Sequence, residues 1–391
     1  MTDIIHISRA NLLSGRTNVY NLAKTCEALN AEQDLRVRLV TTNKKVVSDA
    51  AFFERMAVLR PFLVTCLGAT DTTSPCSGKK WYELIAFFSA NVSLMFFLSA
   101  QARKFNALYF RDSTLVFAAL WVKLVLRKKV FFEIHSVLER RSKQWFNKLA
   151  VQWADGVVAI SSGLKNYYQK ANNNILVSLC SAAEDSWFDY SKNRETLRQQ
   201  LSLPQNAFLV GYTGVIGANP NNDYYEVDDI VRSLADLPVD VSAVIVGEIS
   251  GNAEWLRQIA REFDVSSRVI IVPWQERSVI PNYLQAFDVV LIPKRKKDLI
   301  GDSPAKMFPA LAARRPIIAG RAECIEEVLT NNLDALIVGE NNASGWAKAI
   351  LEIYDDGELG NRLAAQAMVT KNKYTWESRG ANIASFIKRS T

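Results

Sequence analysis

Short apolar runs, each followed by a polar loop and a helical pattern, recur along this chain and constrain its fold more than any other feature. In the first half they lie at residues 4–7, 36–42, 107–111 and 130–135. Apolar runs of this length that alternate with helices are typical of buried parallel strands. Because parallel strands need a crossover connection, usually a helix, the series predicts an α/β fold with right-handed winding.

The series stops about halfway along the chain and then begins again, which predicts two domains. A length of 391 residues exceeds what one hydrophobic core usually serves. The stretch between the two series is polar and suits a connection between domains. The predicted divisions are a first domain at 1–183, a linker at 184–206, a second domain at 207–372 and a final helix at 373–391.

Composition narrows the class of protein and its partners. Hydrophobic residues make up 49% of the chain and charged residues 22%, which is typical of a folded chain and not of a disordered one. The net charge of +7 predicts a tendency to bind acidic partners: anionic lipid, nucleic acid or phosphorylated substrates. Charge alone does not choose among them.

The cysteines and the N-terminus indicate a cellular compartment. Five scattered cysteines without metal-ligand spacing predict reduced thiols and a reducing environment, although a Cys66–Cys76 disulfide stays open. The first residues lack the features of a signal peptide and are typical of a first strand. We therefore expect a cytoplasmic protein.

A long apolar stretch raises the question of a membrane contact. Residues 84–102 contain no charged side chain and are flanked by basic residues, but the length is borderline for a span and the α/β pattern continues around it. We expect a buried or interfacial helix there, and a second apolar helix at 115–125 with a basic end. Together they favour a peripheral contact with an anionic membrane on the inner face of the cell membrane. The alternative is a pair of core helices with solvated basic ends.

Two candidate sites follow strands of the first domain. Gly15 and Arg16 lie in the loop after the first strand, and His135 ends the strand at 130–135. The carboxyl ends of parallel strands are where such folds bind ligands, and an imidazole can donate to a hydroxyl or phosphate oxygen near neutral pH. The alternatives are a turn with a solvated arginine and a structural histidine. His6, in the middle of a strand, is expected to be structural.

In the second domain, Ser303-Pro304 follows an apolar strand and a basic loop, in the cap-then-proline order that starts a helix. The N–H groups of a first helical turn, together with the ammonium group of Lys306, favour an anion such as phosphate. The alternative is an ordinary buried helix. The glycines at 211, 214 and 217 also allow a close approach of backbone to ligand, but their spacing is weak evidence of dinucleotide binding.

The stretch Ser303-Pro-Ala-Lys306, continued to Ala319, resembles the hallmark of the GT-B glycosyltransferases, most closely glycosyltransferase family 4 of the group 1 type. Supporting matches lie at 158–165, 211–214 and 374–379. The resemblance implies two Rossmann-like domains facing a cleft, with a C-terminal helix that crosses back to the first domain. It also implies transfer of a sugar from a nucleotide-diphosphate donor.

The resemblance implies roles for particular residues. His135 and Lys306 would be catalytic, and Gly15 with Arg16 would lie by the diphosphate or the acceptor. The implied donor-binding residues are Gly214, Val215, Glu276, Arg295, Asp302, Ser303, Pro304, Ala305, Lys306 and Met307. The family carries a pair of glutamates that hold the ribose hydroxyls and the transferred sugar, and at those positions this chain has Gly301 and Pro309. Asp302 or Glu276 would therefore supply part of that contact.

The implied reaction uses a nucleotide sugar as substrate, needs no metal or other cofactor, and retains the anomeric configuration. If it does not, a general base such as Glu133 or Glu139 is required. The apolar and basic first domain favours a lipid-linked or polysaccharide acceptor in cell-surface glycan synthesis, and nucleic acid is not the expected partner. Two alternatives remain: a sugar-nucleotide epimerase of the same fold, and a non-catalytic basic protein that binds a membrane or nucleic acid.

Overall fold

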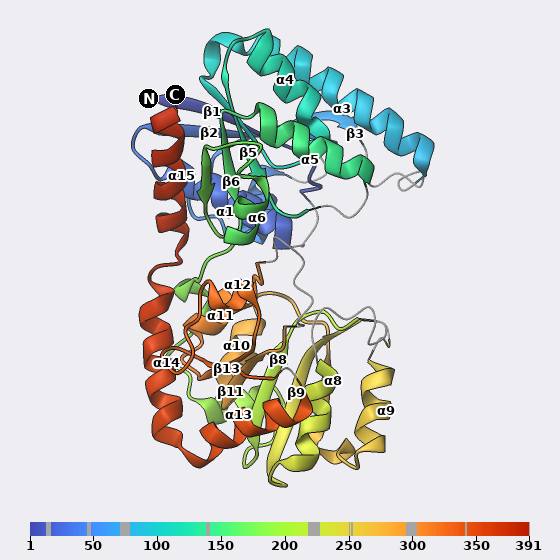
Figure 1. The fold of residues 1–391 in the computed structure, drawn as a ribbon, viewed down its shortest axis with the longest axis vertical. Helices are drawn as coiled ribbons and strands as arrows, with labels where there is room; N and C mark the ends of the chain where they lie inside the picture. The colour runs from blue at the N-terminus through green and yellow to red at the C-terminus, as the bar shows by residue number, and fades with distance from the viewer. Residues whose placement is uncertain are drawn as a thin grey trace. The chain divides into compact units, whose positions relative to one another are not determined.

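The structure is a computed structural model of the chain. It describes residues 1–12, 17–44, 48–70, 79–137, 141–217, 227–249, 251, 253–294, 303–340 and 342–390. The chain divides into two compact units. The first unit contains Met1–Ser181, Leu299–Ser303 and Trp376–Thr391, and the second contains Ala182–Asp298 and Pro304–Thr375. In Figure 1 each unit is a sheet with helices on both faces.

The first unit is built on a sheet of seven parallel strands in the order β3-β2-β1-β4-β5-β6-β7. The order reverses between β1 and β4, which makes this a doubly wound sheet. The strands are β1 (Thr2–Ser8), β2 (Leu35–Asn43), β3 (Leu63–Thr70), β4 (Ala107–Phe110), β5 (Lys129–Ile134), β6 (Gly156–Ala159) and β7 (Ile175–Val177).

Helices cover both faces of this sheet. One face packs against α3, α4 and α5 through a single apolar cluster, in which Leu94, Val122 and Val151 meet strand residues such as Phe132. The other face lies under α1 and α15. The helices are α1 (Thr17–Asn30), α2 (Asp49–Arg55), α3 (Lys80–Ala100), α4 (Val116–Leu124), α5 (Arg141–Trp153), α6 (Ser162–Tyr168) and α15 (Trp376–Ser390).

The second unit has a parallel sheet of six strands in the order β10-β9-β8-β11-β12-β13, and its core is a second apolar cluster. The strands are β8 (Phe208–Thr213), β9 (Val241–Glu248), β10 (Val269–Pro273), β11 (Val289–Ile292), β12 (Ile317–Gly320) and β13 (Leu336–Val338). The helices are α7 (Arg194–Gln200), α8 (Val227–Ser233), α9 (Glu254–Glu262), α10 (Ile280–Ala286), α11 (Met307–Ala312), α12 (Glu323–Glu326), α13 (Ala343–Asp355) and α14 (Gly357–Lys371).

The last helix, α15, packs on the first unit, as the resemblance implies. Its Gly380 lies against the backbone of Ala28 in α1, and Phe386 makes an edge contact with Phe131 of β5 at 6.0 Å between ring centroids. An ion pair of 3.2 Å between Lys388 and Asp34 continues the contact towards the end of the helix. Figure 1 accordingly shows the N- and C-termini close together.

The start of α11 corrects a prediction. The helix begins at Met307 with Lys306 in the capping position, so Ser303 does not cap it. Residues 304–306 form a turn closed by a 3.0 Å hydrogen bond from the Met307 N–H to the Pro304 carbonyl. The later start explains why Pro309 is tolerated, because the first N–H groups of a helix have no partner inside the helix. At six residues, α11 is also too short to supply much dipole.

The stretch predicted as a linker, 184–206, contains α7, and the side chain of Asn193 caps this helix by accepting from the Thr196 N–H. Arg198 of α7 is buried and donates to Asp288 at 2.6 Å. This stretch therefore packs onto the second unit.

The predicted apolar helix at 84–102 is α3. Its segment Trp81–Ala100 is long and apolar enough to cross a membrane by length and composition. No disulfide joins the cysteines that the structure describes, Cys26, Cys66, Cys180 and Cys324, while Cys76 lies outside those residues.

The close contact between α15 and α1 predicts an effect of adding one methyl group. A Cβ atom at position 380 would lie 2.8 Å from the Ala28 carbonyl oxygen, so Gly380→Ala must push the helices apart. We expect a loss of about 1–3 kcal/mol in the free energy of unfolding, measured by urea titration. Gly357→Ala is the matched control, because a Cβ there meets nothing within 4 Å. Equal stability of the two variants would contradict this close packing of α15 on α1.

Candidate functional site

His135 lies at the carboxyl end of the first sheet, directly after β5. Its side chain is 31% exposed, and its Nε2 lies 2.6 Å from Oε1 of Glu133. Residues two apart in a strand project from the same face. His135 and Glu133 therefore form a pair on the side of the sheet that α1 and α15 cover.

Glu133 is buried and has three partners. Its Oε2 accepts hydrogen bonds from the Tyr109 hydroxyl and, at 2.7 Å, from the Arg379 guanidinium, while Oε1 faces His135. Burial alone would raise the pKa of this carboxyl, but the charge of Arg379 and the hydrogen bonds from His135 and Tyr109 hold it well below its usual range. Glu133 is therefore an ionised carboxylate inside the first unit at neutral pH.

The imidazole of His135 is held neutral by its surroundings. Burial lowers its pKa below the usual value, and the hydrogen bond and charge of Glu133 oppose that shift only in part. Arg111 and Arg379 are the cations whose charges also lower it. A neutral imidazole has one N–H donor and one acceptor nitrogen, so His135 is suited to hydrogen bonding with a hydroxyl.

His6 is a core residue, as its position in the middle of β1 predicts. Its Nδ1 lies 3.4 Å from the Cys26 sulfur, and its ring meets the Tyr109 ring edge-on with centroids 4.8 Å apart. Burial lowers the pKa of His6 to about 3. The imidazole is therefore uncharged throughout the ordinary pH range.

In the second unit, the structure brings Gly214 and Lys306 together at the carboxyl end of β8. Lys306 Nζ donates to the Tyr212 hydroxyl at 2.7 Å and lies 4.2 Å from the centre of that ring. Gly214 follows β8 directly, and a side chain there would collide with Lys306 Nζ and the Tyr212 hydroxyl. The carboxyl end of β8 thus carries an ammonium group above a glycine turn, an arrangement suited to an anionic ligand.

The remaining predicted donor residues are spread more widely. Val215 is exposed in the turn after β8, and Met307 is fully buried as the first residue of α11. Glu276 lies in the exposed loop after β10, two strands away from β8. Pro304 and Ala305 belong to the turn before α11 in the second unit, whereas Ser303 groups with the first unit.

Several predicted residues lie outside the part of the chain that the structure describes: Gly15, Arg16, Glu139, Arg295, Gly301 and Asp302. Within the described part, no group of three or more histidine, cysteine, aspartate or glutamate residues is arranged to hold a metal ion.

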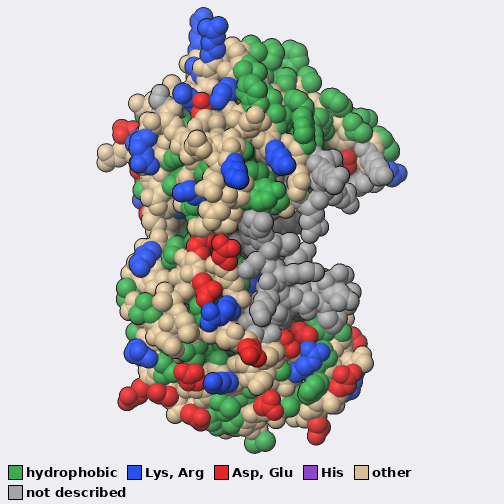
Figure 2. All heavy atoms as spheres, viewed as in Figure 1, with side chains coloured by type: hydrophobic (Ala, Val, Ile, Leu, Met, Phe, Trp, Pro, Cys, Tyr) green, Lys and Arg blue, Asp and Glu red, His purple; other side chains and the backbone are tan. Residues whose placement is uncertain are grey.

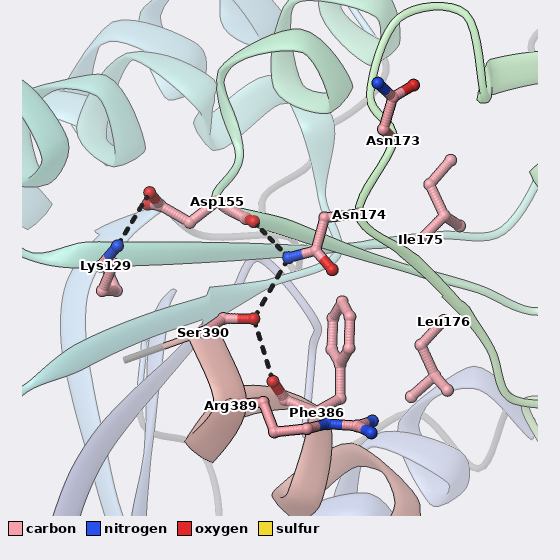
Figure 3. A pocket seen from close by; sticks show the side chains of 9 residues that line it. All are labelled: Lys129, Asp155, Asn173, Asn174, Ile175, Leu176, Phe386, Arg389 and Ser390. Atoms are coloured by element: carbon pink, nitrogen blue, oxygen red, sulfur yellow. Dashed lines mark hydrogen bonds and ion pairs between the residues drawn. The ribbon is translucent and has the colours of Figure 1, made fainter.

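The first unit has a hollow of about 610 Å³, and Figure 3 shows the side chains that line it. It is lined where β5, β6 and β7 begin, by Lys129, Asp155 and Asn174, and by the end of α15. Asn174 donates to the Asp155 carbonyl at 2.7 Å and to the Ser390 hydroxyl at 3.1 Å. Since ligands of open parallel sheets bind at the carboxyl ends of the strands, this hollow at the amino ends is not the candidate site.

Three residues of these clusters were not among the predicted site residues: Tyr109, Tyr212 and Arg379. Tyr212 and Arg379 stand inside segments that matched the family, at 211–214 and 374–379, but no residue pattern shows where their side chains point. Glu133 was considered only as a general base. Its place two residues before His135 was the available signal that the two side chains share a face.

Comparison with solved structures identifies the architecture. HepE from Anabaena, solved with UDP, superimposes with a TM-score of 0.74 at 17% identity, covering 100% of both chains. Sucrose-phosphate synthase from Thermosynechococcus elongatus gives 0.74 at 16% identity, covering 100% of this chain and 99% of that one. The two Rossmann-like units and the returning helix α15 thus form a GT-B fold, which confirms the predicted fold class.

The similarity to a family lies in the second unit. Residues 207–356 match the model for glycosyl transferases of group 1, the type of enzyme that the resemblance at 303–319 indicated. Among curated relatives, the D-inositol 3-phosphate glycosyltransferase of Xylanimonas cellulosilytica is 25% identical over 201 residues, 51% of this chain and 46% of the relative. The alpha-D-kanosaminyltransferase of Streptomyces kanamyceticus is 22% identical over 204 residues, 51% of this chain and 50% of that one. The chain thus spans about half the length of the curated relatives it matches.

Burial of His6 predicts a pH-dependent stability. Its pKa is about 3 in the folded chain and near 6.5 when unfolded, so only the unfolded state takes up a proton as the pH falls between those values. We expect this group to remove about 1.4 kcal/mol of unfolding free energy per pH unit below 6. Urea titrations from pH 7 to pH 4 should therefore show a steeper loss in the natural protein than in His6→Gln. Parallel curves would contradict the burial of a neutral His6.

Proposed function

We propose that the protein is a glycosyltransferase that moves a sugar from a nucleotide-diphosphate donor to a glycan acceptor. The match of residues 207–356 to the group 1 glycosyl transferases carries the proposal. The cationic turn at the end of β8 supports it, since a leaving nucleotide diphosphate is anionic. Solved neighbours of the same fold include HepE, which was crystallised with UDP-glucose.

Lys306 is the proposed source of charge stabilisation. An ammonium group held in place beside a glycine turn can meet the negative charge that develops on the departing diphosphate without reorganising. Tyr212 holds that ammonium group through a hydrogen bond and its ring face. Because the lysine supplies the positive charge, the proposed transfer requires no metal. Arg295 and Asp302 stay in the proposal as neighbours of the same ligand.

We further propose that the anomeric configuration is retained, with the leaving phosphate assisting attack from the same face. Glu133 is the carboxylate that contacts His135 in the described part of the chain, but it is buried and engaged by three partners. It is therefore unsuited to take a proton directly from an acceptor, which argues against the alternative in which Glu133 is the general base. His135 would instead contact a hydroxyl group of the sugar or the acceptor.

The proposed acceptor is a lipid-linked or polysaccharide glycan of the cell surface. The exposed apolar side chains of α3 and α4 support a lipid-linked acceptor. Some relatives are named for glycosyl transfer to D-inositol 3-phosphate, so an inositol phosphate is the second acceptor to test. Both classes fit a basic protein, because both present phosphate groups.

An apolar surface on α3 and α4 supports contact with a membrane. Trp81, Ile85, Phe88 and Phe96 of α3 are exposed, with Phe96 at 75%, and they lie on one stripe at helical spacing. Exposed Trp121, Leu124 and Val125 extend the surface onto α4. Figure 2 shows hydrophobic side chains gathered on the part of the first unit where α3 and α4 lie. An exposed apolar area of this kind marks an interaction surface.

Basic residues at the ends of the two helices fit an anionic membrane. Lys79 precedes α3, Arg103 and Lys104 follow it, and Arg127 follows α4, all exposed. The opposite side of α3 packs into the first core through Ala90, Leu94 and Leu98, so the helix cannot span a bilayer without leaving that core. We therefore propose a peripheral contact, with α3 lying in the headgroup region on the inner face of the cell membrane.

Transfer should depend on Lys306. Lys306→Met removes the cation near the departing diphosphate, so we expect kcat/KM to fall by about 10²–10³-fold. The assay follows labelled sugar from UDP-, GDP- and ADP-sugars onto membrane lipid, glycan and inositol phosphate acceptors, with EDTA present. Lys348→Met on the exposed face of α13 is the matched control and should keep full activity. Interconversion of sugar nucleotides without transfer would favour an epimerase, and no reaction or binding with any sugar nucleotide would refute an enzyme of this class.

Membrane binding should depend on the α3 stripe and on charge. Phe96→Ser is expected to weaken sedimentation with phosphatidylglycerol vesicles about tenfold, because it removes an aromatic side chain that would insert into the membrane interface. Phe263→Ser, at a 42% exposed phenylalanine of the second unit, is the matched control and should bind normally. High salt should release the natural protein from the vesicles. Protein that resists both salt and alkaline carbonate would instead be spanning the membrane, and protein that never binds would refute the contact.

A further inference from the structure

Arg379 joins four separate segments of the first unit. From α15 its NH1 donates to the carbonyls of Ser178 and Leu179 at 2.7 and 2.5 Å, and its Nε lies 3.4 Å from the Thr25 hydroxyl in α1. Its NH2 donates to Glu133 of β5 at 2.7 Å. The guanidinium is buried, and each of its three nitrogens has a partner. Its position is therefore fixed by the fold.

Glu133 passes this constraint to His135. Oε2 is occupied by Arg379 and by the Tyr109 hydroxyl, so the carboxylate plane is set from both sides. The other oxygen, Oε1, lies 2.6 Å from His135 Nε2. A carboxylate only accepts hydrogen bonds, so Nε2 must carry the proton.

The second ring nitrogen of His135, Nδ1, then carries no proton. With the proton on Nε2 of a neutral imidazole, Nδ1 keeps its lone pair. Among the described residues nothing donates to Nδ1, and the side chain is partly exposed at the end of β5. Nδ1 can therefore accept a hydrogen bond from a ligand hydroxyl.

We propose that Arg379 and Glu133 are positioning residues for His135: they hold its imidazole as the Nε2–H tautomer and leave Nδ1 to accept a hydrogen bond from a sugar or acceptor hydroxyl. The role of Nδ1 rests on the proposed function, whereas the tautomer does not. A buried ion pair is a poor way to gain stability alone, since apolar residues of similar volume are often at least as stable. Its value here is that it orients a neighbouring polar group, as carboxylates that accept from a histidine N–H do in metal sites.

The tautomer can be read directly, because the chain contains only two histidines. Long-range ¹H–¹⁵N spectra of the natural protein at pH 7 distinguish Nε2–H from Nδ1–H imidazoles, and His6→Gln assigns the two rings. We expect His135 as a neutral Nε2–H imidazole. A spectrum with the proton on Nδ1, with both tautomers populated, or with a charged ring overturns the proposal.

Removing the Glu133 carboxylate tests whether it sets the tautomer of His135. Glu133→Gln leaves the Arg379 charge buried without a partner and can unfold the unit, so Glu133→Gln/Arg379→Met, which removes both charges, is the second variant. In whichever variant folds, we expect a mixture of the two tautomers. Lys388→Gln on the same helix, which breaks only the ion pair with Asp34, is the control and should leave the spectrum unchanged. An unaltered His135 spectrum in the double variant refutes the role of the pair.

Enzyme kinetics distinguish a positioning role of the Arg379–Glu133 pair from a role in stability alone. With UDP-glucose as the probe, or another sugar nucleotide that the natural protein turns over, the double variant should lose about 10²-fold in kcat with KM for the donor little changed. A loss confined to thermal stability, with normal kcat, refutes positioning. If the natural protein turns over no sugar nucleotide, the proposed function fails, while the spectra still decide the tautomer.

Discussion

The buried ion pair between Arg379 and Glu133 is the contact on which the first unit depends. Taking two charges out of water is costly, and a pair of this kind is tolerated only when every donor and acceptor is satisfied. Here Arg379 also donates to two backbone carbonyls, and Glu133 also accepts from Tyr109 and His135. Breaking one partner would leave a charge buried alone, at a cost of about 3–5 kcal/mol. The same network therefore anchors α15 and aligns the imidazole at the edge of the sheet.

Both units place their polar chemistry at the carboxyl ends of parallel strands, but they support it differently. In the first unit the support is a charge pair within the sheet and its covering helix. In the second it is close packing: Gly247 at the end of β9 leaves room for the backbone of Gly214, which in turn leaves room for Lys306. Glycine is required at position 247 because any side chain there would collide with the Gly214 backbone, whereas a side chain at position 214 would displace the end of Lys306. A ligand at the end of β8 would thus approach backbone directly, which suits phosphate oxygens.

The sequence predicted what depends on local pattern and missed what depends on distance. The central strands were found because buried parallel strands are continuous apolar runs. Two strands had no such signal: β3 at the edge of the first sheet is only partly buried, and β7 has three residues. Ser303-Pro304 carried a helix-start pattern, but a turn delays α11 to Met307. His135 was found from its place after a strand, whereas Arg379 was not, because 246 residues separate it from Glu133.

The position of Arg379 in the chain has a consequence for how the protein is made. A ribosome produces Glu133 early and Arg379 only after the whole of the second unit has been synthesised. During that interval the nascent first unit has a sheet face that α15 does not yet cover, and a carboxylate without its cation. Glu133 then either stays in contact with water or takes up a proton. The first unit is therefore completed by the segment most distant from it in the chain, and the network that aligns His135 can close only after that segment has been made.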